Sequence, residues 1–250
     1  MWVYTGDANH PHDVFDYTPD RKGERPKEFL GEFEGYLQAD AYAGYEDVYR
    51  TGKVVEVACW AHTRRKFFEA KDTDAANSAT AMEFIGKLYD VEREGKGLDA
   101  KARRELRAAK SRVILDEFRK WLDAQSRILL PKSPMGQAIA YTLSNWTALN
   151  RYLDDGDLDI DNNEAERALR RVAIGRKNWL FAGSDEGGRR AAIIYSLIST
   201  CRRHEVNPFE YLRDVIERVS AHPASRIDEL LPHRWKTLRT AAVKSAADTS

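Results

Sequence analysis

Two carboxylates, Asp40 and Glu166, occupy sequence positions from which a fold could bring them to the same metal ion. Asp40 follows residues 36–39, which are typical of a buried strand, and Glu166 lies one turn into a helix predicted from Asn162 onward. This combination suits metal-dependent phosphoryl transfer, in which two Mg²⁺ ions about 4 Å apart activate the attacking oxygen and stabilise the leaving one. Mg²⁺ prefers oxygen ligands, so a few carboxylates suffice. Spacing alone does not single out this pair, because the chain has 40 acidic residues.

Basic residues accompany both carboxylates. Cationic side chains beside metal-binding carboxylates are what a phosphodiester substrate requires, so they are candidate DNA contacts. They are Arg64, Arg65, Arg170, Arg171, Arg176 and Lys177. The alternative is a set of solvated or ion-paired surface charges. In particular, Glu166 and Arg170 are four residues apart, the spacing of a surface ion pair on one helix.

Two Cys-x-x-His pairs offer a different chemistry. Cys59 with His62, and Cys201 with His204, together supply the four ligands that a structural zinc site needs. The alternative is that Cys59 packs in a strand and Cys201 in a buried helix, as free cysteines often do.

The elements that must position these residues are expected to include strands in the first part of the chain and helices in the rest. Strands are expected at residues 2–5, 13–18, 36–39 and 53–60. Residues 70–155 read as a helical block with three apolar stripes, the second spanning 106–121 and the third 139–149. The helix carrying Glu166 should bury Ala165, Leu169 and Val172. A largely buried helix is expected over residues 189–201, and another over 208–219 with an apolar face made by Phe209, Leu212, Val215, Ile216 and Val219. The tail after Arg239 is expected to be disordered.

The composition gives no global electrostatic argument for nucleic acid. Lys and Arg total 40 and so do Asp and Glu, so any such argument must rest on clustering. No apolar run approaches the roughly 20 residues of a membrane span, and the start lacks the pattern of a signal peptide. Two cysteines imply no disulfide framework and favour a cytoplasmic setting.

Five stretches together resemble the motifs of one family. They are residues 37–45, 58–67, 162–170, 175–184 and 195–200. In this order they are similar to the DDE transposases of the insertion sequence 66 family, and the match extends over nearly the whole chain.

The resemblance implies an α/β fold: a ribonuclease H-like mixed sheet with a large helical insertion and C-terminal helices. The expected segments are core strands (1–69), the helical insertion (70–155), the catalytic helix with the helices that complete the core (156–220), and a partly disordered extension (221–250). It also implies cleavage and transfer of DNA strands at the ends of a mobile element, with two divalent ions. Partners would be element and target DNA, further copies of the chain or accessory transposition proteins, and no membrane.

By motif, Asp40 is the second catalytic acid and Glu166 the third. Glu164 is the rival for the third role, but two helical positions correspond to about 200°, so only one of the two can face Asp40. The family's first Asp lies on a strand before the segment equivalent to Trp2–Tyr4, where this sequence has nothing. Asp7, Asp13 and Asp16 are the nearest stand-ins. We therefore expect a transposase fragment that is inactive alone. The alternative is a non-catalytic DNA-binding or oligomerisation module that associates with full-length transposase.

Overall fold

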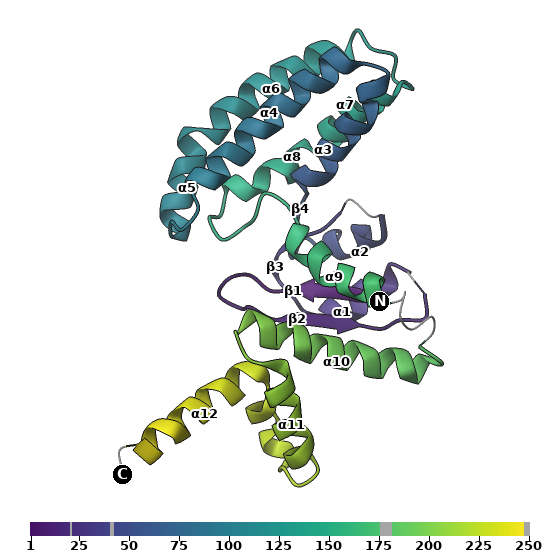
Figure 1. Cartoon of the computed structure of the whole chain (residues 1–250). Helices are drawn as coiled ribbons and strands as arrows, with labels where there is room; N and C mark the ends of the chain where they lie inside the picture. The colour runs from purple at the N-terminus through teal and green to yellow at the C-terminus, as the bar shows by residue number, and fades with distance from the viewer. Residues whose placement is uncertain (21, 41–42, 176–181, 248–250) are drawn as a thin grey trace. The chain divides into compact units, whose positions relative to one another are not determined.

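The computed structural model describes residues 1–250 except 21, 41–42, 176–181 and 248–250. It contains two compact units, and each is described by itself. Unit 1 combines Met1–Asp20 with Glu164–Ser250, and unit 2 is Arg21–Asn163. These boundaries differ from those of the four segments expected from the sequence. Figure 1 shows the elements of both units.

Unit 2 joins a small parallel sheet to a bundle of helices. The sheet pairs β3 (Gly35–Gln38) with β4 (Val54–Val57), with Gly35 opposite Val54 and Gln38 opposite Val57. The connection between these strands holds the short helix α2 (Glu46–Tyr49), and α1 (Glu24–Leu30) precedes them. The bundle consists of α3 (Trp60–Glu69), α4 (Ala75–Glu94), α5 (Ala100–Ala109), α6 (Ser111–Ser126), α7 (Pro134–Ser144) and α8 (Trp146–Asn150).

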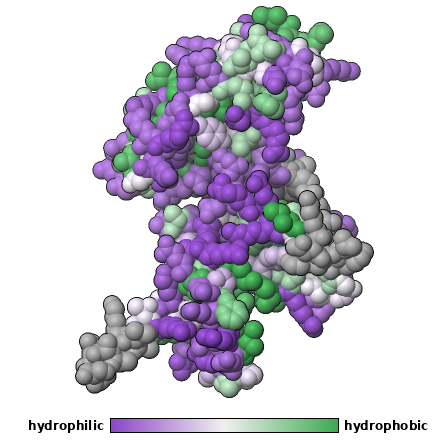
Figure 2. Space-filling model, viewed as in Figure 1, coloured by the Kyte–Doolittle hydropathy of each residue, from purple (hydrophilic) through white to green (hydrophobic). Residues whose placement is uncertain are grey.

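The core of unit 2 is apolar and rich in aromatic residues. Trp60, Phe67 and Phe118 are fully buried, and the Phe118 ring stacks on Phe84 with centroids 4.9 Å apart. The indole nitrogen of Trp60 donates to the carbonyl of Leu149 at 2.8 Å, so its one polar atom is satisfied. The visible face of the bundle is mostly hydrophilic, as Figure 2 shows, so the apolar residues have gone inside.

One arginine lies inside this core. Arg107 on α5 is 0% exposed, and its Nε and Nη2 donate to the carboxylate of Glu92 on α4 at 2.9 and 2.7 Å. Its remaining N–H groups donate to the carbonyls of Tyr152, Asp155 and Leu158. A buried guanidinium is tolerated because every donor has a partner. Arg107 therefore fastens the segment after α8 to the bundle.

Unit 1 packs a β-hairpin on a long helix. Strands β1 (Trp2–Thr5) and β2 (Asp13–Asp16) are antiparallel, and β2 lies against α10 (Asp185–Arg203). Gly188 permits the close approach, because a Cβ there would lie 2.4 Å from the Tyr17 ring. The unit also holds α9 (Asn163–Gly175, from Glu164 onward), α11 (Pro208–Val219), the 3-10 segment Ala224–Leu230 and α12 (Pro232–Ala247).

Polar side chains connect the hairpin to α10. Asp13 is 4% exposed, and its carboxylate accepts from the Ser199 hydroxyl and from Nη1 of Arg203 at 3.0 Å. The same Arg203 nitrogen lies 2.9 Å from Oε1 of Glu164 on α9. Arg171 of α9 donates to Ser199 at 2.9 Å. We call Asp13, Glu164, Arg171, Ser199 and Arg203 the polar network of unit 1.

The four strands among the described residues form one antiparallel and one parallel two-stranded sheet, in a mostly helical structure. This is consistent with an α/β class. None of the helices within the described part of the chain is both long and apolar enough to cross a membrane.

Several helical expectations were wrong in detail. The stripe over 106–121 belongs to two helices, because the chain breaks at Lys110, and the stripe over 139–149 is divided at Asn145. On α11, Phe209 is 73% exposed and Ile216 67%, while Tyr211 is buried instead. Tyr211 hydrogen-bonds the carbonyl of Leu230 at 2.6 Å, a long-range contact that periodicity does not reveal.

Three further expectations need correction. On α10, Ile193 is 59% exposed, so this helix buries one side only. On α9 the buried residues are Ala168 and Gly175, whereas Leu169 is 37% exposed, because the helix turns Ala168 toward Phe15 and Ala192. Beyond Arg239 the chain continues in α12 as far as Ala247 rather than being disordered. Its Ala and Lys residues are good helix formers.

Candidate metal and nucleic-acid site

Asp40 lies at the carboxyl end of the parallel sheet of unit 2. The ladder continues one step past β3, where the Ala39 amide donates to the carbonyl of Val57 at 3.2 Å. Asp40 is the next residue and is exposed. Cys59 and the start of α3 leave the same end of β4. We call this end of the sheet the carboxyl edge. It is the position predicted for Asp40 from the sequence.

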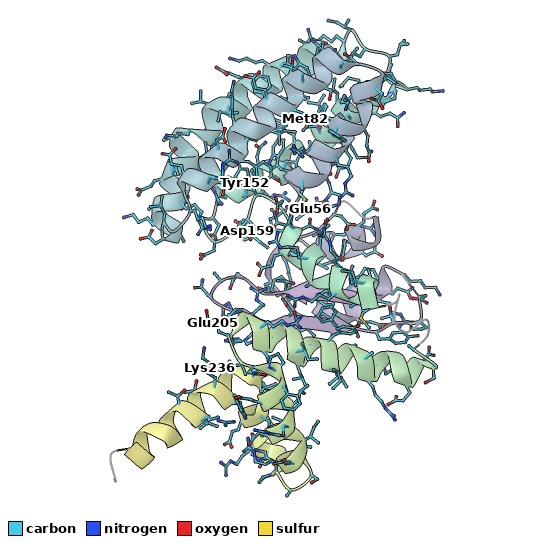
Figure 3. All side chains as sticks on the ribbon, viewed as in Figure 1. Glu56, Met82, Tyr152, Asp159, Glu205 and Lys236 are labelled. Carbon is cyan, nitrogen blue, oxygen red and sulfur yellow. The ribbon has the colours of Figure 1, made fainter. Side chains whose placement is uncertain are left out.

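The segment that enters α9 runs along the carboxyl edge, within unit 2. Nε2 of Gln38 donates to the carbonyl of Asp159 at 2.7 Å, and the Trp60 amide donates to that of Ile160 at 3.2 Å. The Asn162 amide donates to Sγ of Cys59 at 3.5 Å. Figure 3 labels Asp159 and Glu56 in this part of the unit. The residues just before α9 are thus fixed to the segments that precede and follow Asp40.

Asp161 fixes the start of α9. Its Oδ1 accepts from the Asn163 amide at 3.0 Å, as expected of a helix-capping residue, and its Oδ2 accepts from the Tyr89 hydroxyl at 2.7 Å. Burial, followed by this hydrogen bond, raises the pKa of Tyr89. Tyr89 therefore stays a neutral donor that holds Asp161. From the sequence Tyr89 only marks the apolar side of a helix, and its contact with Asp161 is not visible there because 72 residues separate the pair.

Further tyrosines stand near the carboxyl edge. Burial raises the pKa of Tyr141 to about 12, and the nearby Cys59 and Asp40 add to the effect. Burial also raises the pKa of Tyr49, with Glu56, Tyr45 and Asp40 contributing. These phenols remain protonated near neutral pH, so they can donate hydrogen bonds but bring no charge to the edge.

The two glutamates of α9 face different ways. Glu164 forms an ion pair with Arg203 on α10, so its side of α9 is turned toward α10. Glu166 is two residues later, about 200° around the helix, and so projects from another face. The structure thus gives Glu164 a partner inside unit 1, and the assignment of Glu166 to the third catalytic position stays a prediction. Asp40 belongs to unit 2 and Glu166 to unit 1, so their convergence stays a prediction.

Arg64 and Arg65 are exposed on α3 and line a cavity of about 590 Å³ between α3 and α4. Arg93 and Asp90 of α4, which pair with each other, and Asn163 also line it. With three arginines and one aspartate, the lining carries an excess of positive charge. An open, basic cavity is suited to the phosphates of a nucleic acid.

The other residues predicted to contact DNA have different surroundings. Arg170 is exposed on α9. Arg171 donates to Ser199 and so belongs to the polar network. Arg176 and Lys177 lie outside the described residues.

The predicted stand-ins for the first catalytic Asp have other contacts. Asp13 is buried in the polar network. Asp7 accepts from the backbone amides of Asn9 and His10 at 2.9 and 2.8 Å, which closes a turn. Asp16 lies at the end of β2.

The two Cys-x-x-His pairs belong to different units, Cys59 and His62 to unit 2 and Cys201 and His204 to unit 1. Both thiols are buried. Burial raises the pKa of Cys59, and it raises that of Cys201 to about 11. Both therefore have the properties of free core cysteines, and the four-ligand zinc site stays a prediction.

Comparison with known proteins agrees with the motifs. The chain matches a family described as "Transposase IS66 family" over residues 1–190, and one described as "IS66 C-terminal element" over 196–233. Two relatives come from Sinorhizobium fredii (strain NBRC 101917 / NGR234). "Uncharacterized protein y4hP" is 36% identical over 99% of this chain and 49% of its own length, and "Uncharacterized protein y4qI" is 33% identical over 94% and 47%.

The chain therefore spans about half the length of the curated relatives it matches. No solved structure matches it. The two family matches follow each other along residues 1–233, in the order of the motifs. The chain therefore belongs to the IS66 family of transposases.

Proposed function

We propose that this chain contributes to metal-dependent cleavage and transfer of DNA strands by a transposase, acting on mobile-element DNA in the cytoplasm. In this proposal Asp40 and Glu166 are metal ligands of a ribonuclease H-like active site. The observation that supports it most directly is the fixing of the segment before α9 along the carboxyl edge that carries Asp40. Because α9 begins at Asn163, Glu166 is only four residues beyond that anchored segment, which ends at Asn162.

The residues fit a hard divalent cation. Asp40 is exposed at the end of a strand, and both proposed ligands are carboxylates, the donors that Mg²⁺ prefers. When bound, a pair of such ions would activate the attacking oxygen and stabilise the leaving one. The chain's own residues would hold those ions, keep α9 in place through Asp161 and Tyr89, and bind the substrate's phosphates.

Arg64 and Arg65 are the residues proposed to bind DNA phosphate in unit 2, with Arg170 beyond Glu166. They are exposed, and the first two line the basic cavity. Since the whole chain has no net charge, DNA binding depends on such local clusters. Further copies of the chain or accessory transposition proteins are proposed partners, as the resemblance to the family implies.

Metal binding is tested first by the paramagnetic signal of Mn²⁺ in the presence of the full chain. We expect Asp40→Asn and Glu166→Gln each to weaken binding at least tenfold, and Glu164→Gln to leave it unchanged. A loss of binding in Glu164→Gln with normal binding in Glu166→Gln would reverse the assignment of the third ligand.

Catalysis is tested by nicking of supercoiled plasmid that carries element ends, with Mg²⁺ and with chelator. Metal-dependent nicking that Asp40→Asn abolishes is the result expected of a chain with catalytic activity. If the wild-type chain binds the element ends but neither binds Mn²⁺ nor cuts, the alternative of a non-catalytic DNA-binding module is correct.

DNA binding is tested by the salt dependence of affinity for a DNA duplex. Each phosphate contact contributes about 0.9 to the slope of log affinity against log salt for B-DNA. The double variant Arg64→Ala, Arg65→Ala should therefore lower the slope by about 2. Arg104→Ala, an exposed arginine on α5, is the matched control and should leave the slope unchanged. Equal slopes for wild type, the double variant and Arg104→Ala would show that the cavity does not bind DNA.

A further inference from the structure

Three histidines from distant parts of the sequence meet in unit 1. His12 precedes β2, His204 ends α10, and His233 lies in the first turn of α12. One ring nitrogen from each lies within 4.8 Å of the other two. The ring centroids are 5.2 Å apart for His12 and His204, 4.8 Å for His12 and His233, and 5.7 Å for His204 and His233. We call these residues the histidine triad.

Two nitrogens of the histidine triad lack a hydrogen-bond partner among the described residues. Nε2 of His204 and Nδ1 of His233 are both buried from solvent. A buried polar atom without a partner costs free energy, and most such atoms in native proteins are satisfied. Two of the three rings that meet here thus carry a buried nitrogen without a partner, which indicates a missing ligand.

Two rings of the histidine triad have lowered pKa values, and burial is the main cause for both. The pKa of His12 is lowered further by His233, His10 and Arg203 and raised by Asp13, whereas that of His204 is lowered further by His12, His233, Lys236 and Arg203. A neutral imidazole has a free lone pair, which is the form that binds a metal.

The neighbouring cations have anionic partners. Arg203 is paired with Asp13 and Glu164, and Nζ of Lys236 binds the carbonyl of His204 at 2.6 Å and lies 3.9 Å from Glu205. Glu205 and Lys236 are labelled in Figure 3.

We propose that the histidine triad is a binding site for a first-row divalent transition metal ion, most readily Zn²⁺. Three imidazoles suit zinc, copper or nickel, whereas Mg²⁺ prefers oxygen ligands. Zinc sites with three protein ligands keep a fourth position for water or another ligand. Zn–N bonds of about 2.0–2.1 Å place ligand nitrogens about 3.3 Å apart, so the rings must close by up to about 1.5 Å. The triad is the only such group of three or more His, Cys, Asp or Glu residues within the described residues.

The site would join parts of unit 1 that are far apart in the sequence. His12 is on the loop of the β1–β2 hairpin, while His204 and His233 flank α11 and the 3-10 segment. His12 lies in the part matched to the transposase family and the other two in the part matched to its C-terminal element. Metal binding would therefore fasten the C-terminal helices to the hairpin, separately from the proposed catalytic ions.

The test uses the full chain without a histidine tag, stripped of metal by a chelator and titrated with Zn²⁺ against a chromophoric competitor. We expect one tightly bound Zn²⁺ per chain. Zinc at a hundredfold excess over its Kd should raise the unfolding midpoint by about 5–10 °C. His233→Gln and His12→Gln should each weaken binding by about 100-fold or more, because even losses outside the ligand set cost about 10–100-fold. His222→Gln, whose ring bonds the Arg226 carbonyl, is the matched control and should bind normally.

Co²⁺ provides a second readout, since its visible absorption reports the ligands directly. Wild-type protein and His222→Gln should give the same spectrum, and His233→Gln a different or absent one. The metal-free variants should unfold at the same temperature as metal-free wild type, which shows that they fold. No bound zinc in wild type, or equal binding by His12→Gln, His233→Gln and wild type, would overturn the proposal.

Discussion

The two units are stabilised by different interactions. Unit 2 has a continuous apolar core in which Trp60, Phe67 and Phe118 are fully buried and contact residues of the neighbouring helices. Unit 1 has two small apolar clusters, and its hairpin is joined to α10 largely by the polar network. A non-directional apolar core tolerates changes that preserve its volume. A buried polar network fails as soon as one partner is lost, because the other remains desolvated. The two units should therefore respond to different substitutions.

The largest effect is expected from Phe118→Ala in unit 2. Phe118 is 0% exposed and lies against the rings of Phe84, Trp121 and Trp60. Truncating a buried Phe costs about 3–5 kcal/mol through lost burial and the cavity left behind. Hydrogen exchange measured by mass spectrometry should show faster exchange in α4, α6 and α7, with amides of unit 1 unchanged. Phe118→Leu keeps more of the apolar volume than Phe118→Ala, so it is the control and should cost less than half as much. Equal losses of protection in both units would show that they unfold together.

Arg203→Met should have the next largest effect, in unit 1. It leaves Asp13 buried without its cation, and breaking a buried pair costs about 3–5 kcal/mol. Because the Arg203 side chain is 13% exposed, we expect the lower end, about 3 kcal/mol. The double variant Asp13→Asn, Arg203→Met should recover at least half of the loss, measured by chemical denaturation followed through exchange in β2 and α10. No recovery would mean that Arg203 acts by packing and not by charge.

Ser199→Ala should cost about 1–2 kcal/mol, the usual penalty for removing one hydrogen-bonding partner from buried groups. Its hydroxyl donates to Asp13 and accepts from Arg171. The substitution therefore removes one hydrogen bond from each of these two charged groups and leaves their other contacts in place. Ser144→Ala, an exposed serine at the end of α7, is the control and should be neutral within about 0.5 kcal/mol. A neutral Ser199→Ala would show that water replaces the hydroxyl.

The comparison also explains what the sequence could predict. Helices of unit 2 were found from apolar periodicity, because α4 and α6 each repeat their buried residues every three or four positions. Asp40 was placed at a strand end because a strand is a local pattern, although the expectation that this strand is buried was wrong, since Tyr36 of β3 is 38% exposed. In contrast, Asp13 and Arg203 are 190 residues apart, and the histidine triad draws on three separate elements. No local sequence pattern identifies such partners, and spacing alone groups His204 with Cys201 instead. The exposed Phe209 and Ile216 were misassigned for the same reason, since Tyr211 is buried by a distant contact.

The smallest effect concerns Asp214 on α11. Burial opposes its ionised form, but hydrogen bonds from Trp235 and Arg218 outweigh burial and lower the pKa of Asp214. A carboxyl whose pKa is lowered on folding adds stability above its unfolded value of about 3.9 and loses it as pH falls through the folded value. The side chain is 34% exposed, so solvent screening should keep the contribution below about 1 kcal/mol. Between pH 6 and pH 3, wild type should lose slightly more stability in α11 and α12 than Asp214→Asn, measured by exchange corrected for intrinsic rates. An identical decline in both proteins would mean that the contact between Trp235 and Asp214 is held by the packing of the indole and not by the charge.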